Sequence, residues 1–170
     1  MTNSLADVYE AFFDRIEEDE NFFNYFDVDE IQAEELARER ARTYLREACS
    51  YLRRHVTLDF SLNITKDETG EEVFGAELTD DEVYLLGDIM LLIYFERGLA
   101  KLRPKLNTFA ASELKLLHSP ANERQTYVAM IEAQRNRVDY LIADYYAKDR
   151  LTGVAKMIST AIPEETDDEA

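Results

Sequence analysis

The stretch Val83-Tyr84-Leu85-Leu86-Gly87-Asp88-Ile89-Met90-Leu91-Leu92-Ile93-Tyr94-Phe95 (VYLLGDIMLLIYF) is apolar except at Gly87 and Asp88. It is too short for a membrane span, which needs about 20 predominantly apolar residues, and it also carries a charge. Apolar side chains on nearly every face of a helix indicate a helix that neighbours cover on most sides. We therefore predict that this stretch is the central helix of the fold.

Sequence signals on both sides set the limits of this central helix. Thr79 and Glu82 have the spacing of a capping box, in which each side chain bonds the backbone N–H of the other residue. The two aspartates between them add negative charge at the positive end of the helix dipole. Pro104 disfavours helical geometry at the residue before it, so the helix is expected to end at Arg103.

Apolar residues at helical spacing predict three further helices around the central one. They are expected at residues 4–17, 29–55 and 120–148, the last with Ser119 as its N-cap and Pro120 as its first residue. In the second of these, acids lie early and arginines lie late, as the helix dipole favours.

The last two of these helices have apolar stripes that predict which faces are buried. The stripe of residues 29–55 consists of Ala37, Ala41, Tyr44, Leu45, Ala48, Leu52 and His55. The stripe of residues 120–148 consists of Tyr127, Met130, Ile131, Gln134, Val138, Leu141, Ile142 and Tyr145. Gln134 lies in the middle of its stripe, where a polar side chain often sets the register between helices.

Two segments between the helices have other patterns. Residues 57–65 alternate apolar and polar side chains, and residues 72–75 follow the turn residue Gly70. This predicts a β-hairpin-like insert at about 57–77. The aromatic stretch 21–27 (NFFNYFD) predicts a packed turn or a single helical turn.

The predicted fold is therefore mainly α, a bundle of about four helices with a hairpin-like insert and an extended C-terminal tail. Residues 1–148 are predicted to form a single helical domain. Residues 149–170 are predicted to form a C-terminal extension with a disordered acidic end. Residues 150–162 have no clear period, and we expect them to order only in an assembly.

The chain of 170 residues has a formal net charge of −17, and the charge is unevenly distributed. Residues 1–30 hold 10 acids against one arginine, and residues 57–85 hold 9 acids against one lysine. Residues 31–56 hold six arginines against four acids. Such a surface is a poor partner for free nucleic acid and for anionic membranes. Three interpretations of the acidic blocks stay open. The blocks form one acidic face, they meet basic patches of a neighbouring copy, or they keep the protein in solution.

No residue pattern in the sequence points to catalysis, to a metal or to a cofactor. The two histidines, His55 and His118, have no carboxylate or second histidine at metal-ligand spacing. The single cysteine, Cys49, has no base near it in the sequence and is predicted to be a small buried side chain. The chain has neither a glycine-rich phosphate loop nor the G-x-S-x-G motif. We therefore expect a protein that is not an enzyme. The N-terminus has no basic region followed by an apolar run, so we expect no signal peptide. The single cysteine favours a reducing compartment.

Two regions of the chain carry a family resemblance. The first is Leu78-Thr79-Asp80-Asp81-Glu82-Val83, which continues to Tyr94-Phe95-Glu96-Arg97 and Lys101-Leu102. The second is His118-Ser119-Pro120-Ala121-Asn122-Glu123-Arg124 with the later Asp149-Arg150-Leu151-Thr152-Gly153. Together with the acidic, aromatic N-terminal region, they resemble the head–tail connector (neck or adaptor) proteins of tailed phages that infect Gram-positive bacteria. The resemblance extends over most of residues 8–156.

This resemblance implies a structural virion protein. It implies a ring of identical helical subunits in the neck, which binds the portal protein and the next neck or tail protein, while DNA only passes through the lumen. Before assembly such a subunit would lie in the host cytoplasm, without contact to a membrane. The resemblance names no catalytic residue.

The candidate interface residues lie in the arginine-rich helix and at the end of the chain. They are Arg38, Arg42, Arg46, Arg150, Leu151, Val154, Met157 and Ile158. We expect the three arginines of the helix to approach acids of the next subunit, which would make assembly weaker at high salt.

Two other classes of protein fit the same composition. A strongly acidic helical protein can present carboxylates in place of DNA phosphates and so inhibit a DNA-binding enzyme. The arginines of residues 31–56 and the tail after Lys148 weigh against this hypothesis. The third hypothesis is a plain helical interaction module. The oligomeric state, alone and with a candidate partner, distinguishes the three.

Overall fold

The computed structural model describes residues 4–16, 20–23, 25, 27–56, 62–66, 68, 72–108 and 120–156. Its helices are α1 (Leu5–Phe13), α2 (Glu20–Phe23), α3 (Glu30–His55), α4 (Asp80–Thr108) and α5 (Pro120–Ala147). An antiparallel hairpin of β1 (Ile64–Lys66) and β2 (Glu72–Phe74) lies between α3 and α4 in the sequence. The prediction of a mainly helical bundle with a hairpin insert is confirmed.

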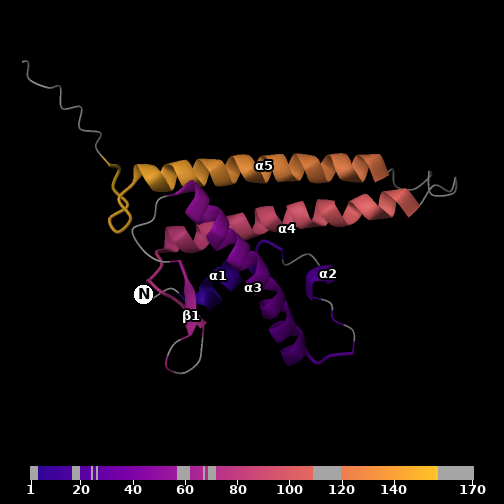
Figure 1. Cartoon of the computed structure of the whole chain (residues 1–170), viewed down its shortest axis with the longest axis horizontal. Helices are drawn as coiled ribbons and strands as arrows, with labels where there is room; N and C mark the ends of the chain where they lie inside the picture. The colour runs from indigo at the N-terminus through magenta and orange to yellow at the C-terminus, as the bar shows by residue number, and fades with distance from the viewer. Residues whose placement is uncertain are drawn as a thin grey trace, which may run out of the picture.

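The helix α4 lies at the centre of the bundle, as its sequence predicted. Figure 1 shows α5 running along one side of α4, while α1 and α3 pack against it from the other side. Every residue from Val83 to Ile93 is buried except Tyr84. Because neighbours cover α4 on several sides, this helix can be apolar around most of its circumference.

One aromatic cluster joins the first four helices. Phe12, Phe22, Tyr44 and Tyr94 come from α1, α2, α3 and α4, and their ring centroids lie 5.7–6.3 Å apart. Phe22 belongs to the single helical turn α2, which is one of the two forms predicted for residues 21–27. Such ring pairs add to the stability that burial of their apolar surface provides. The short α2 is thus held in place because its ring is part of the core.

The helix α5 forms an outer layer that packs along α4. Ile131 and Val138 are buried in the contact, and Gln134 is buried between them, as its place in the predicted stripe indicated. At Gly98 of α4, an added Cβ atom would lie 3.0 Å from the ring of Tyr127. The missing side chain at this glycine therefore lets the two long helices approach closely.

Three details of the helices differ from the sequence-based predictions. Met130, predicted on the buried stripe of residues 120–148, is exposed. The prediction that the central helix ends at Arg103 is wrong, because α4 continues to Thr108. Pro104 removes a single backbone donor near the end of a long helix, and a helix can continue through such a proline. His55, predicted on the buried stripe, is exposed at the last residue of α3 and stacks on Tyr51, with ring centroids 4.2 Å apart.

Some of the predicted positions lie outside the described residues. They are Gly70 in the predicted hairpin turn, the first part of the predicted strand at residues 57–61, and His118 and Ser119 before α5.

The central position of α4 predicts what shortening its side chains will cost. Ile89→Ala and Leu92→Ala each truncate a buried side chain, and each is expected to lower the free energy of unfolding by about 2–5 kcal/mol. Tyr140→Ala, on an exposed face of α5, should change it by less than about 1 kcal/mol. Urea denaturation followed by circular dichroism measures all three. Losses below about 1 kcal/mol at both α4 positions would contradict a central α4.

Candidate functional site

The chain folds back on itself directly after α5 as a closed turn, here called the C-terminal turn (residues 148–156). Its two ends pair in an isolated β-bridge between Lys148 and Ala155. Inside the turn, the Gly153 N–H donates to the Asp149 carbonyl at 2.8 Å. Gly153 has a φ of 67°, in the left-handed region that glycine adopts without strain. The sequence predicted order in this segment only in an assembly, whereas the structure describes a hydrogen-bonded turn within the single chain.

Arg150 ties the C-terminal turn to the bundle through Glu82. The Nε and Nη2 atoms of Arg150 donate to the two carboxylate oxygens of Glu82 at 2.6 and 3.0 Å. The Tyr145 hydroxyl donates to Glu82 Oε1 at 2.6 Å, and the Thr79 N–H donates to Oε2 at 2.8 Å. Glu82 is fully buried, and burial of its charge is tolerated because these donors replace the water that it loses.

Tyr145 and Arg150, the two side chains that donate to Glu82, keep their protons near neutral pH. Burial and, after it, the hydrogen bond and charge of Glu82 raise the pKa of Tyr145, so its hydroxyl remains a donor. The hydrogen bond with Glu82 also raises the pKa of Arg150, so the guanidinium remains charged. Both side chains therefore remain hydrogen-bond donors across the physiological pH range.

The C-terminal turn presents apolar side chains to solvent. Leu151 is 80% exposed and Val154 is 65% exposed, and Tyr146 at the end of α5 is 54% exposed. The Lys156 ammonium lies 5.4 Å from the centroid of the Tyr146 ring. Isolated exposed apolar side chains are ordinary. In the C-terminal turn, however, exposed apolar side chains lie close together on a backbone that hydrogen bonds hold in place. Binding a partner there would cost little conformational entropy.

A second buried carboxylate, Asp88, joins the turn after α1 to α4 and α5. Asp88 is 2% exposed. Its oxygens accept from Arg15 at 3.1 Å, from Arg137 at 2.8 Å and from Gln134 at 3.1 Å. Burial by itself raises the pKa of Asp88, but the hydrogen bonds from Arg137 and Gln134 and the charge of Arg15 outweigh it and lower the pKa. This network ties α5 and the turn after α1 to the central helix, and its carboxylate is buried, so we assign it a structural role.

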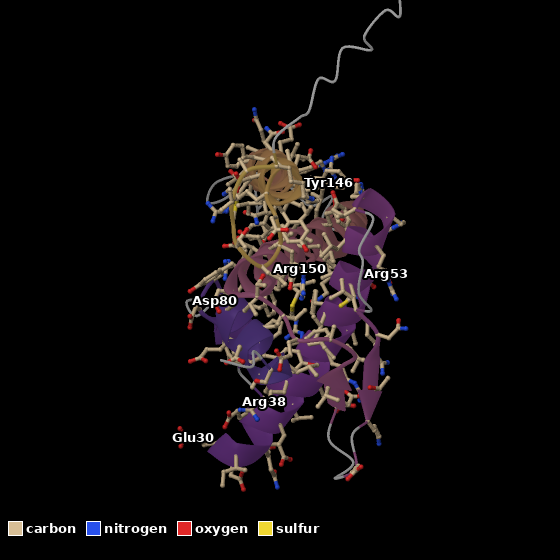
Figure 2. All side chains as sticks on the ribbon, turned by 90° about the vertical axis from the view of Figure 1, so that its left-hand side faces the viewer. Glu30, Arg38, Arg53, Asp80, Tyr146 and Arg150 are labelled. Carbon is tan, nitrogen blue, oxygen red and sulfur yellow. The ribbon has the colours of Figure 1, made fainter. Side chains whose placement is uncertain are left out.

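A groove with a volume of about 550 Å³ lies between α1 and the first half of α3, and we call it the α1–α3 groove. Its apolar lining residues are Ala6, Tyr9, Phe13, Phe23, Ala33 and Ala37. Its charged lining residues are Glu10, Glu30, Glu34 and Arg38. Arg38 donates to Glu34 at 2.7 Å, so the charged rim is negative overall. Figure 2 shows Glu30 and Arg38 at the end of the molecule that lies away from Tyr146.

The three arginines predicted as interface residues are paired within the chain. Arg38 contacts Glu34 one helical turn earlier, at the α1–α3 groove. Arg42 and Arg46 both reach Glu72 of β2, the latter at 4.0 Å, so they join α3 to the hairpin. An acid from a second copy would have to compete with these partners.

The candidate residues near the C-terminus have different positions. Leu151 and Val154 are exposed on the C-terminal turn, where a partner could reach them. Arg150 points inward to the bundle and positions the turn. Met157 and Ile158 lie outside the described residues.

Sequence reasoning missed the two buried carboxylates and the groove. Asp88 had a signal, because it is the only charge within the apolar run 83–95. A lone charge in such a run has to find a partner if the run is buried. Glu82 was recognised only as a capping residue, and its pairing with Arg150 joins positions far apart in the sequence.

Three further features of the described parts of the chain concern metal binding, thiol reactivity and membrane insertion. No group of three or more His, Cys, Asp or Glu side chains there could hold a metal ion. Burial raises the pKa of the Cys49 thiol to about 11, which leaves it protonated at neutral pH. None of the helices described here is long and apolar enough to cross a membrane.

Comparisons with protein-family models, with curated proteins and with solved structures found no match to this chain. The function must therefore be argued from the surfaces just described. Those surfaces are the C-terminal turn, with its exposed apolar side chains, and the α1–α3 groove, with its acidic rim.

The Asp88 network predicts a contribution to stability that acid removes. A carboxyl group with a lowered pKa in the folded protein stabilises the fold above its unfolded-state pKa, about 3.9, and this stabilisation is lost as the pH falls through the folded-state pKa. Asp88→Asn should lower the free energy of unfolding at pH 7 by about 1.5–3 kcal/mol, because its bonds to Arg15 and Arg137 lose their charge.

Urea titrations at pH 7 and at about pH 3 measure this effect. The difference between wild type and Asp88→Asn should shrink at the lower pH, because a protonated aspartate resembles asparagine. Asp139→Asn on the exposed face of α5 serves as the control. A difference that stays the same at both pH values would contradict the assigned role of Asp88.

The Glu82 anchor predicts that Arg150→Met loosens the C-terminal turn. The backbone amides of Gly153 and Lys156, which donate within the turn and to Ala147, should exchange on the order of 10-fold faster or more. Hydrogen exchange measured by NMR reports both amides. The matched control is Lys148→Met, which removes a neighbouring cation that pairs with Asp144 instead.

A second variant separates loosening of the turn from general unfolding. Arg150→Met leaves the Glu82 charge buried without its cation, which destabilises the bundle as well. Glu82→Gln combined with Arg150→Met removes that charge, so the double variant should recover stability while its turn still exchanges rapidly. Wild-type protection of Gly153 in the double variant would show that other contacts hold the turn.

Proposed function

We propose that the protein is a structural subunit of a phage neck, a head-to-tail connector that forms a ring between portal and tail. The observation that carries the proposal is the C-terminal turn, which exposes Leu151 and Val154 on a backbone anchored to the bundle. The resemblance of residues 78–97, 118–124 and 149–153 to connector proteins supplies the biological context.

The C-terminal turn has the properties expected of a docking element. Its apolar side chains stand out from the surface, where they can enter a pocket of a partner protein. Its conformation is held by Arg150 and by hydrogen bonds within the turn, so little entropy is lost on binding. A subunit that must bind several neighbours in a fixed geometry benefits from such a rigid contact.

The charge of the chain is compatible with a ring around DNA. With a net charge of −17, a surface that faces the lumen would repel phosphates and would let DNA slide without binding. Acids also line the hollow beside α1, where Asp7, Glu10, Asp14 and Asp80 lie together.

The alternative, an acidic DNA mimic, receives less support from the contacts. A mimic needs surface carboxylates that are available in place of phosphates. Several acids of this chain instead pair with arginines of the same chain. These acids are Glu34, Glu47, Glu72 and Glu96, which pair with Arg38, Arg97, Arg42 and Arg135.

The proposal predicts that the chain is present in phage particles and that the C-terminal turn is needed for its incorporation. Particles purified from host cells that carry the gene should contain the chain, as mass spectrometry detects. A variant with Leu151→Asp and Val154→Asp, supplied in place of the wild type, should be incorporated at least about 10-fold less, because burying a charge in a docking pocket costs more than about 1.4 kcal/mol.

Met130→Asp is the control, since Met130 is an exposed apolar residue far along α5 from the turn. Circular dichroism of each purified variant verifies that the bundle is folded. If wild-type particles lack the chain, the connector proposal is overturned. If the double variant is incorporated like the wild type, the C-terminal turn is not the docking element.

A further inference from the structure

We propose that the α1–α3 groove is the receptor for the C-terminal turn of a second copy of this chain. The inference rests on the proposed function, because it supplies the contact between successive subunits of the ring. The two surfaces differ, so each copy offers one turn and accepts one turn. Such a head-to-tail contact generates a ring when its rotation closes and a filament when it does not.

The apolar parts of the two surfaces match in kind and size. Alanines at positions 6, 33 and 37 line the α1–α3 groove, and the rings of Tyr9 and Phe13 complete its walls. Small side chains allow a partner's backbone to come close, and aromatic walls provide apolar area for its side chains. Leu151 and Val154 are exposed on a tight turn, a shape that can enter a groove of this volume.

The charges of the two surfaces are opposite. Glu10, Glu30 and Glu34 line the groove, where a single arginine accompanies them. On the C-terminal turn, Arg150 is bound to Glu82 and Lys148 to Asp144, and the Asp149 carboxylate accepts from the N–H groups of Leu151 and Thr152. Lys156 is therefore the charge that the turn offers to the acidic rim of the groove.

The groove cannot take the C-terminal turn of its own chain while the anchor is intact. Glu82, which holds the turn through Arg150, faces α5 through its bond with Tyr145. The groove is formed by α1 and α3, which pack against α4 from the other side. Figure 2 agrees, because Arg150 lies near the middle of the molecule and Glu30 and Arg38 lie at one end. A second copy is therefore the source of the turn.

Complementation between two defective variants tests this pairing. The turn variant carries Leu151→Asp and Val154→Asp and keeps its groove. The groove variant carries Ala6→Arg and Ala33→Arg, which add bulk and positive charge, and keeps its turn. Sedimentation velocity of the full-length proteins should find concentration-dependent association for the wild type and loss of association for each variant alone. An equimolar mixture should form dimers and nothing larger, since only one intact turn and one intact groove can meet.

A matched control carries Ala129→Arg and Ala133→Arg, two exposed alanines on α5. This control has the same net charge as the groove variant and should associate like the wild type.

Covalent capture provides a second measurement. A chain with Ala33→Cys and a chain with Val154→Cys should form a disulfide-linked dimer when mixed and not when each is oxidised alone. The native Cys49 is buried and should not interfere.

The outcomes separate this inference from the proposed function. A mixture that stays monomeric, in a protein whose wild type associates, overturns the pairing of turn and groove. Association lost in the turn variant but kept in the groove variant means that the turn docks elsewhere, and the connector proposal then stands without the inference. If Lys101→Glu abolishes association and the turn variant still associates, the contact belongs to the basic end of α4. A wild type that is monomeric yet present in particles overturns the inference alone, whereas absence from particles overturns both.

Discussion

Two carboxylates on the central helix are buried, and the arrangement of the other helices depends on how their charges are neutralised. A buried charge is tolerated only where cations and hydrogen-bond donors replace the lost water. Asp88 takes its partners from the turn after α1 and from α5, and Glu82 takes its partners from α5 and the C-terminal turn. Apolar packing explains why these elements collect around α4. The carboxylates explain why each element meets α4 at one register, because a shifted helix would leave a charge without its partner.

This use of charge inside the bundle also decides what remains on the surface. Arginines of α3 pair with the hairpin and with their own helix, and Arg97 covers the Tyr44 ring at 4.3 Å while it bonds Glu47. Cations of the chain are thus engaged internally, whereas acids of α1 stay at the surface around the α1–α3 groove. Surface pairs of this kind contribute little stability each. Their larger effect is on recognition, since they leave an acidic face that attracts an apolar segment carrying a cation.

The elements could be predicted from the sequence because their signals are local. The apolar run at residues 83–95, the capping box of Thr79 and Glu82 and the alternation before Gly70 each lie within a few neighbouring residues. The contacts that join the elements could not be predicted, because residues such as Arg150 and Glu82 are 68 positions apart in the sequence. The groove had no signal either, since alanines on two helices form it only after α1 and α3 have packed. The C-terminal turn could not be predicted from a helical period, because a closed turn has no such period.

The position of the Glu82 network gives the C-terminal turn a mechanical role beyond its exposed side chains. Glu82 caps the first turn of the central helix and bonds Tyr145 at the end of the outer helix. A force applied to Leu151 or Val154 therefore passes through Arg150 into the two longest helices of the bundle, not into a flexible tail. This link connects the proposed docking element directly to the part of the chain that is most deeply buried, so the turn and the central helix are positioned together.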